Sequence, residues 1–291
     1  MVQRLTCCLL LAIGCMQGHA ASRTVIDDAG NHVTLAQPAR RIISLAPHAT
    51  ELLYAAGAGE AIVGVSEYSD YPPAAKKIAS VGGAAALDIE RIVTLKPDLV
   101  VAWYHGNSAS QIARLRALHI PVFESEPRDF AVVATSLERL AALSGTEASG
   151  NAAAQGFRTH VQRLTTTYQS RAPVTVFYQI WGEPLMTLNG THIVSAAIRL
   201  CGGVNIFENL PQIAPVVSTE AVLRADPQVI VSGGSDALAL AGWRRFTGMR
   251  AVRQHALINL NADFLTRPAP RIIDGTEQLC RQLDVARHAS E

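Results

Sequence analysis

The sequence predicts an α/β protein made of two Rossmann-like lobes, each with a sheet rich in parallel strands, joined by one long rigid helix. From residue 41 onward, short apolar segments typical of buried strands alternate with segments of helical periodicity. A pattern of helix, proline and apolar strand at residues 87–103 also returns in weaker form at residues 216–234. The alternation indicates an α/β architecture, and the internal repeat indicates two related halves.

Each copy of the repeat carries the local signals of a helix followed by a covered strand. Asp88 and Ser218 can cap the helices, because their side chains can accept hydrogen bonds from first-turn N–H groups. Pro97 and Pro227 end the helices, and the apolar runs that follow are typical of strands covered on both faces. Ligands of such sheets bind beyond the carboxyl ends of the strands. The residues after these two strands are therefore expected to line a cleft.

The other elements follow from the same alternation. In the first half, strands are expected at residues 42–45, 62–66 and 121–125, with helices at residues 49–59, 108–120 and 130–145. In the second half, strands are expected at residues 174–181 and 256–260, with helices at residues 193–200, 238–254 and 271–285 and a loop at residues 261–270.

The segment between the halves has no strand pattern, and its apolar residues recur at helical intervals. We expect it to form the helix that joins the lobes. Gly150 and Gly156 lower its intrinsic helix propensity, so its stability is expected to come from packing against both lobes. The chain then divides into a signal peptide, a first lobe, an interlobe helix and a second lobe, at residues 1–20, 23–145, 146–171 and 172–291.

The amino terminus is typical of an export signal. Residues 1–20 contain one arginine, a short apolar run and then small residues, and the run is too short to span a bilayer. Cleavage after Ala20 is one interpretation, and a lipoprotein with a lipid on Cys15 is the other. An exported protein is expected in either case.

Composition and motifs exclude several classes of function. The chain has 25 Lys and Arg against 24 Asp and Glu, and loss of Arg4 with the signal leaves a net charge near zero, which argues against nucleic-acid binding. Gly57 and Gly59 follow a predicted helix and lack the third glycine of a dinucleotide-binding fingerprint. The histidines are scattered singly. We therefore expect a monomer that is not an enzyme and has no cofactor and no metal.

Several aromatic residues fall where strands are predicted to end. These are Tyr68, Trp103, Tyr104, Trp181 and Phe264. Rings that converge on a cleft suit a large planar ligand, whose polar edge Asp263 and Arg267 could hold, although packing within each lobe is an alternative. His48 and His105 also follow strand ends, and either could reach the cleft or be an ordinary polar residue at its rim. A distant alternative is an exported enzyme that uses Asp263 and a histidine as acid and base.

Two further pairs of residues are candidates for function or stability, one of glutamates and one of cysteines. Glu90 and Glu220 occupy equivalent places in the first turn of the repeated helices, where a carboxylate stabilises the helix dipole by roughly 0.3–1 kcal/mol. Both are expected to be exposed, so they could present matched charges to a partner. Cys201 and Cys280 are the cysteines outside the signal region, and in an exported protein they suggest one disulfide, with two separate buried thiols as the alternative.

The combined motifs resemble the class III periplasmic binding proteins of ABC importers over residues 41–283. The resemblance is densest in ISLAPHATELLYAAG, VGVSEYSDYPP, LDIERIVTLKPDLVVAW, CGGVNIF and DFLTRPAPRII. It implies a class III periplasmic binding protein fold, a ligand held between the lobes, and docking on a membrane permease and its ATPase. It implies ligand contacts at Tyr68, Asp263 and Arg267. The chain also retains the family's tryptophan, as Trp103. The resemblance also implies permease contacts at Glu90 and Glu220 and a disulfide between Cys201 and Cys280.

The resemblance is strongest to members that bind cobalamin, so a corrinoid is the expected ligand. The chain has Ala84 and Ala214 where those members have tryptophans, which removes large stacking surfaces. Trp181 and Tyr104 could compensate from other directions. A related corrinoid, a haem and a ferric siderophore stay open as ligands.

Overall fold

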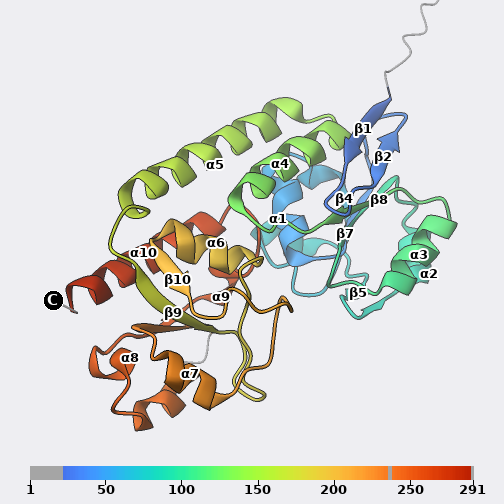
Figure 1. The fold of residues 1–291 in the computed structure, drawn as a ribbon. Helices are drawn as coiled ribbons and strands as arrows, with labels where there is room; N and C mark the ends of the chain where they lie inside the picture. Colours follow the sequence, from blue (N-terminus) through green and yellow to red (C-terminus); the bar gives the residue numbers. More distant parts are fainter. Residues whose placement is uncertain (1–21, 235–237, 290–291) are drawn as a thin grey trace, which may run out of the picture.

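The computed structural model describes residues 22–234 and 238–289. Figure 1 shows two α/β lobes beside each other, with α5 (Glu147–Tyr168) running along one side of both. The predicted signal peptide lies outside the described residues. Within those residues, no helix combines the length and the apolar character that a membrane crossing needs.

The first lobe is built on a four-stranded parallel sheet in the order β4-β3-β7-β8. Its strands are β3 (Ile42–Ser44), β4 (Ile62–Val65), β7 (Leu99–Trp103) and β8 (Val122–Ser125). Its helices are α1 (Pro47–Ala55), α2 (Ile89–Thr94), α3 (Ala109–Ala117), α4 (Phe130–Ser144), η1 (Gly59–Ala61) and η2 (Pro73–Lys77). Two small hairpins complete it, β1 (Arg23–Ile26) with β2 (His32–Leu35) and β5 (Gly82–Gly83) with β6 (Ala86–Leu87).

The second lobe repeats this plan with the strand order β10-β9-β11-β12, again parallel. Its strands are β9 (Val174–Gln179), β10 (Gly203–Asn205), β11 (Val229–Gly233) and β12 (Leu257–Leu260). Its helices are α6 (Ile193–Leu200), α7 (Thr219–Ala225), α8 (Arg250–Arg253), α9 (Ala262–Leu265), α10 (Ile272–His288) and η3 (Ala241–Arg245).

The internal repeat is confirmed in both its caps and its strands. The Asp88 carboxylate accepts a hydrogen bond from the Arg91 N–H at 2.9 Å, and the Ser218 hydroxyl accepts one from the Ala221 N–H at 3.1 Å. The helices that they cap lead into β7 and β11, which hold the same third position in their sheets. Leu99 and Val100 in β7 are both fully buried, in separate apolar clusters, so this strand is covered on both faces as expected.

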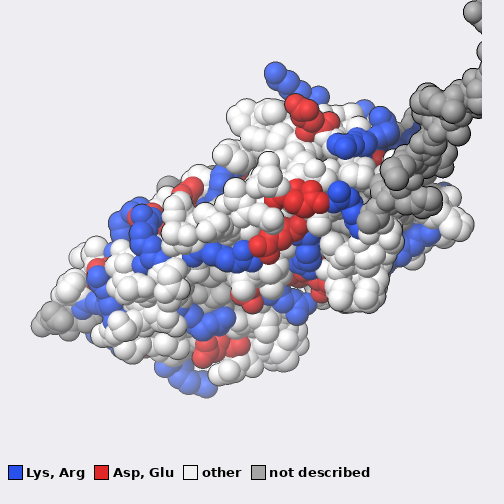
Figure 2. Space-filling view, turned by 90° about the horizontal axis from the view of Figure 1, so that it is seen from above, with Lys and Arg blue, Asp and Glu red and all other residues white. Residues whose placement is uncertain are grey.

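The predicted joining helix is α5, which packs on α1 and α4 of the first lobe and on α6 and α10 of the second. Gly150 is needed where α5 crosses α4, because a Cβ there would lie 2.2 Å from the Cβ of Ala141. Arg158 on α5 also pairs with Glu138 on α4 at 2.6 Å. Figure 2 shows basic and acidic side chains interspersed over this upper face.

Two local predictions were wrong, and the first hairpin was missed. Residues 238–254 do not form one helix, because Gly242 and Gly248 interrupt it and only η3 and α8 form. The predicted loop at residues 261–270 contains α9, where the Asn261 side chain accepts from the Asp263 N–H at 2.9 Å. The hairpin β1–β2 was missed because its strands are four residues long and only partly buried.

The two cysteines of the second lobe form the expected disulfide. Cys201 follows α6, Cys280 lies in α10, and the bond joins positions that are 79 residues apart in sequence. Both residues are fully buried. The Arg287 guanidinium on α10 donates to the carbonyl of Cys201 and, at 2.6 Å, to that of Ala172, so α10 is fixed to the chain on both sides of the second lobe's first strand.

Candidate functional site

A small cavity of about 30 Å³ lies between the lobes beyond the carboxyl ends of β7 and β8. The first lobe borders it with Trp103, Glu126 and Arg128, and the second lobe borders it with His192 and Thr266, among others. Trp103 ends β7, Glu126 and Arg128 follow β8, and His192 caps the start of α6, which is where a parallel sheet presents ligand-binding groups. We call this space the interlobe cleft.

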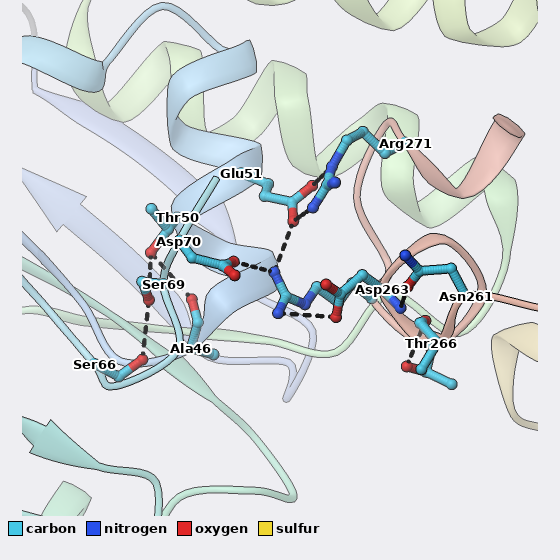
Figure 3. Close-up of polar contacts among 12 residues, drawn as sticks. Ala46, Thr50, Glu51, Ser66, Ser69, Asp70, Asn261, Asp263, Thr266 and Arg271 are labelled. Atoms are coloured by element: carbon cyan, nitrogen blue, oxygen red, sulfur yellow. Dashed lines mark hydrogen bonds and ion pairs between the residues drawn. The ribbon is translucent and has the colours of Figure 1, made fainter. Parts of the chain in front are cut away.

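Five charged residues connect the lobes, and Figure 3 labels Glu51, Asp70, Asp263 and Arg271 among them. We call this set the ion network, and its members are Glu51, Asp70, Asp263, Arg267 and Arg271. Arg267 Nη1 lies 2.7 Å from Asp70 Oδ1 and 3.4 Å from Glu51 Oε1, and its Nη2 lies 2.9 Å from Asp263 Oδ1. Arg271 donates to both Glu51 oxygens, with its Nε 2.8 Å from Oε2. Arg267 therefore lies among three carboxylates, two of them from the opposite lobe.

Glu51 is the centre of the ion network. It lies in the middle of α1 and is 3% exposed, so its charge is sustained by the guanidinium groups of Arg267 and Arg271 rather than by water. Arg271 is held in turn by the rings of Tyr71 at 3.8 Å and Phe264 at 5.2 Å. Its hydrogen bond with Glu51 raises the pKa of Arg271 above its usual value, despite an opposing effect of burial. The Arg271 guanidinium group therefore stays charged.

Asp70 is the exposed member of the ion network. Partial burial acts to raise its pKa, but the hydrogen bond and the charge of Arg267 outweigh that effect, and the pKa lies below its usual value. Asp70 is therefore ionised at neutral pH and pairs with Arg267 as a carboxylate.

Tyr68 precedes Asp70 in a loop that is tied to the first lobe. Thr50 donates to the Ser69 hydroxyl at 3.0 Å, and the Ser66 and Ser69 hydroxyls lie 3.2 Å apart. Tyr68 has a positive φ of 63° and is 80% exposed. A tyrosine in this conformation with its ring in solvent is typical of a functional position. The ring borders a cavity of about 530 Å³ that is lined by residues 65–80.

Trp103 and His48 form a second unit, at the end of β7. The Trp103 ring meets the His48 ring edge-on, with centroids 5.8 Å apart. Gly106 makes this position possible, because a Cβ there would lie 2.0 Å from the indole. The Asn107 side chain accepts from the Trp103 N–H at 2.6 Å. The indole is thus fixed with 37% of its surface exposed.

The structure corrects one of the two histidine interpretations. His48 is not a rim residue, because it is 4% exposed and its Nε2 has no hydrogen-bond partner among the described residues. Burial lowers the pKa of His48 to about 4, a backbone hydrogen bond with Ser125 opposes the shift, and the charge of Arg267 adds to it. His105 does lie at the rim, exposed and 3.4 Å from Glu126.

The remaining predicted site residues lie on both lobes. Trp181 follows β9 and is 62% exposed, with its indole N–H donating to the Glu183 carbonyl at 2.8 Å. It borders a cavity of about 500 Å³ at the ends of β9 and β11. Tyr104 is half-exposed beside His105. Phe264 packs on Arg271 instead of facing open solvent, so its contribution to the cleft is to position that arginine.

Sequence reasoning missed three members of the ion network, Glu51, Asp70 and Arg271. A weak signal exists for Glu51, which is a charged residue inside the otherwise apolar helix sequence ATELL. Nothing local distinguishes Asp70 in its turn or Arg271 at the start of α10. Their pairing depends on how the lobes meet.

Glu90 and Glu220 lie on α2 and α7, in separate lobes (Figure 1). Both are exposed as expected. Hydrogen bonds with its own backbone N–H and with Ser218 hold the pKa of Glu220 below its usual value. Glu220 is therefore fully ionised at neutral pH.

Comparison with known proteins identifies relatives for nearly the whole described chain. The family model "Periplasmic binding protein" matches residues 42–264. The Vitamin B12-binding protein of Vibrio cholerae serotype O1 is 43% identical over 251 residues, which is 86% of this chain and 91% of that protein. The printed names of the family and of this relative both describe binding proteins.

Solved structures agree with the observed fold. The crystal structure of the periplasmic Vitamin B12 binding protein BtuF of Vibrio cholerae matches with a TM-score of 0.81 and 43% identity, covering 86% of this chain and 98% of that chain. The periplasmic heme-binding protein BhuT, in complex with two hemes, matches with a TM-score of 0.75 and 24% identity, covering 86% and 100%. The second likeness shows the fold alone.

Proposed function

The chain belongs to the periplasmic binding protein family, and from this premise we propose that it captures a corrinoid, cobalamin or a related cobamide, between its lobes and delivers it to the permease of an ABC importer. The proposal follows the relatives that are named as vitamin B12-binding proteins. No chemical step is required of such a protein. It binds, closes and releases.

The observation that supports this function most directly is that both lobes present exposed rings at or just beyond the carboxyl ends of their parallel strands. Tyr68 and Trp103 offer ring faces from the first lobe, and Trp181 offers one from the second. A corrin macrocycle is broad and apolar on its faces, so it gains by stacking on such rings. Its amide side chains can accept hydrogen bonds from Arg267 and donate them to Asp263.

Delivery is assigned to the two exposed glutamates. We place Glu90 and Glu220 against basic residues of the permease. Because each lobe carries one of these carboxylates, both can pair with the permease at once only when the lobes are the right distance apart. A rim charge of this kind acts mainly on association and specificity. The protein is expected to act in the periplasm as a monomer, after removal of a signal peptide at Ala20 or lipidation at Cys15.

The test is a ligand panel on purified mature protein, followed by isothermal titration calorimetry. Cyanocobalamin and cobinamide are expected to bind with one site per chain, whereas haem and ferric siderophores are not. Absence of binding to every corrinoid would overturn the proposal. A Soret shift with haem, lost on replacing His48, His105 or Tyr68, would instead assign the site to haem.

Two variants test whether the ligand binds at the interlobe cleft. Arg267→Ala is expected to weaken cyanocobalamin binding about 10- to 100-fold, because a charge-assisted hydrogen bond contributes about 1.5–3 kcal/mol. Arg281→Ala is the matched control, since Arg281 forms an exposed pair with Glu277 on α10. Equal affinities of the two variants would remove Arg267 from the site.

A further inference from the structure

Both guanidinium groups at the interlobe cleft already carry carboxylate partners. Arg267 has Asp70, Asp263 and Glu51, and its side chain is 15% exposed. Arg271 has Glu51 on two of its nitrogens, and its side chain is 18% exposed. Both arginines are therefore already paired with carboxylates of the protein.

The ion network carries an excess of negative charge. Three carboxylates, Glu51, Asp70 and Asp263, accompany two guanidinium groups, so one negative charge is left over. Glu67 and Lys76 line the cavity beside Tyr68, where the Lys76 charge also acts on Asp70, and Glu126 and Arg128 line the interlobe cleft, so these further charges are equal in number. A carboxylate brought to Arg267 would therefore meet net repulsion in a partly desolvated place.

The hydrogen-bonding capacity of Arg267 leads to the same conclusion. A guanidinium group has five N–H donors in a planar fork, and three carboxylate oxygens approach it. Donors are left for an oxygen that brings no charge, such as an amide carbonyl. Asp70 is the partner on the exposed side, with 48% of its side chain accessible, so it stands where a ligand group would approach.

We propose that Asp70 and Glu51 determine the ligand class of this cleft: by occupying Arg267 they admit a neutral ligand rich in amide groups and exclude one that bears carboxylates at that position. The inference rests on the proposed corrinoid function and adds the physical basis on which the cleft would select among ligands. It separates amide-bearing corrinoids from haem and from anionic siderophores by charge, although all of them are large conjugated or metal-bearing molecules.

The test compares a neutral corrinoid with derivatives in which one amide is replaced by a carboxylate. Cyanocobalamin is compared with its monocarboxylates, in which one side-chain amide is hydrolysed to an acid, each isomer being titrated separately at pH 7. The proteins are the full mature chain, Asp70→Asn, and Glu60→Gln as the matched control, since Glu60 is an exposed carboxylate in η1 outside the cleft.

The wild-type protein is expected to bind at least one monocarboxylate about tenfold more weakly than cyanocobalamin. Asp70→Asn is expected to reduce that preference at least about fivefold, while Glu60→Gln retains it. Tight binding of cyanocobalamin without preference against any isomer would overturn this inference and leave the corrinoid function standing, as would an unchanged preference in Asp70→Asn. Failure to bind any of these corrinoids would overturn the proposed function and the inference with it.

Discussion

Glu51 in the first lobe and Arg271 in the second form a two-pronged ion pair across the interlobe cleft, and the carboxylate is almost fully buried. The pair joins α1 to the start of α10. Because a buried charge without its partner is costly, the pair favours a fixed approach of the lobes at this end. The opening for a ligand is then expected on the side of Tyr68 and Trp103, where the rings are exposed.

Removal of the Glu51 charge is expected to destabilise the protein. Glu51→Gln leaves Arg271 and Arg267 partly buried without their shared partner, and breaking a buried ion pair costs about 3–5 kcal/mol. The free energy of unfolding in urea measures this loss. Glu277→Gln, in an exposed pair on α10, is the control and is expected to cost less than about 1 kcal/mol. Equal losses in both variants would contradict the central place given to Glu51.

The disulfide is expected to contribute about 4 kcal/mol, because it closes a long loop in the unfolded chain. Its ends lie 79 residues apart in sequence. The double variant Cys201→Ala with Cys280→Ala should therefore unfold at lower urea concentration without losing ligand affinity. Reduction of the wild-type protein by a thiol should be slow in the native state, since both residues are buried. Loss of binding together with stability would indicate that the second lobe needs the bond to form.

Local sequence signals were sufficient for the fold. Asp88 and Ser218 predict the helix starts, and Pro97 and Pro227 predict where the helices end and the strands follow. Each repeat can therefore be recognised within a short stretch of sequence. The repeat then indicates two lobes without any knowledge of distant contacts. Glycine-interrupted stretches such as residues 238–254 failed because propensity there is weak and packing decides the outcome.

The site could be predicted only in part. Arg267 and Asp263 were expected at the cleft from their place in the chain and from a family resemblance, whereas Glu51 lies 220 positions from Arg271 and carries no local sign of that pairing. The burial of His48 likewise depends on the Trp103 ring at the end of β7. That ring can take its position only because residue 106 is a glycine. Contacts between lobes are tertiary, so no periodicity encodes them.

Gly106→Ala is expected to displace the Trp103 indole, because the added Cβ would lie 2.0 Å from the ring. Displacement should change the tryptophan emission and weaken cyanocobalamin binding by about tenfold. Gly156→Ala is the control, since a Cβ at this exposed position on α5 meets nothing within 4 Å. Unchanged emission and affinity in Gly106→Ala would show that the indole position is not set by this glycine.

Stability is expected to fall as the pH is lowered from 7 to 5, in part because of His48. Its pKa is about 4 in the folded protein against 6.5 as the ordinary value, so the unfolded state binds the proton first. The folded state is therefore favoured above pH 6.5, and that contribution is lost as the pH falls toward 4. The loss between pH 7 and pH 5 amounts to about 2 kcal/mol.

Urea unfolding at both pH values measures this dependence. His48→Gln should show a smaller difference between pH 7 and pH 5 than the wild-type protein, whatever its absolute stability. His160→Gln, on the exposed side of α5, should retain the wild-type difference. A difference in His48→Gln as large as that of the wild type would assign the pH dependence to other groups.

Loss of both exposed glutamates is expected to reduce transport without weakening ligand binding. Glu90 and Glu220 lie on α2 and α7, outside the interlobe cleft, so the double variant Glu90→Ala with Glu220→Ala should bind cyanocobalamin with unchanged affinity. Uptake of labelled cobalamin by cells that depend on this protein should fall at least about tenfold, since two charge pairs with the permease are removed. Glu60→Ala, another exposed carboxylate of the first lobe, should leave uptake unaffected. Weakened ligand binding in the double variant would contradict the placement of these residues outside the cleft, and normal uptake would remove them from the docking surface.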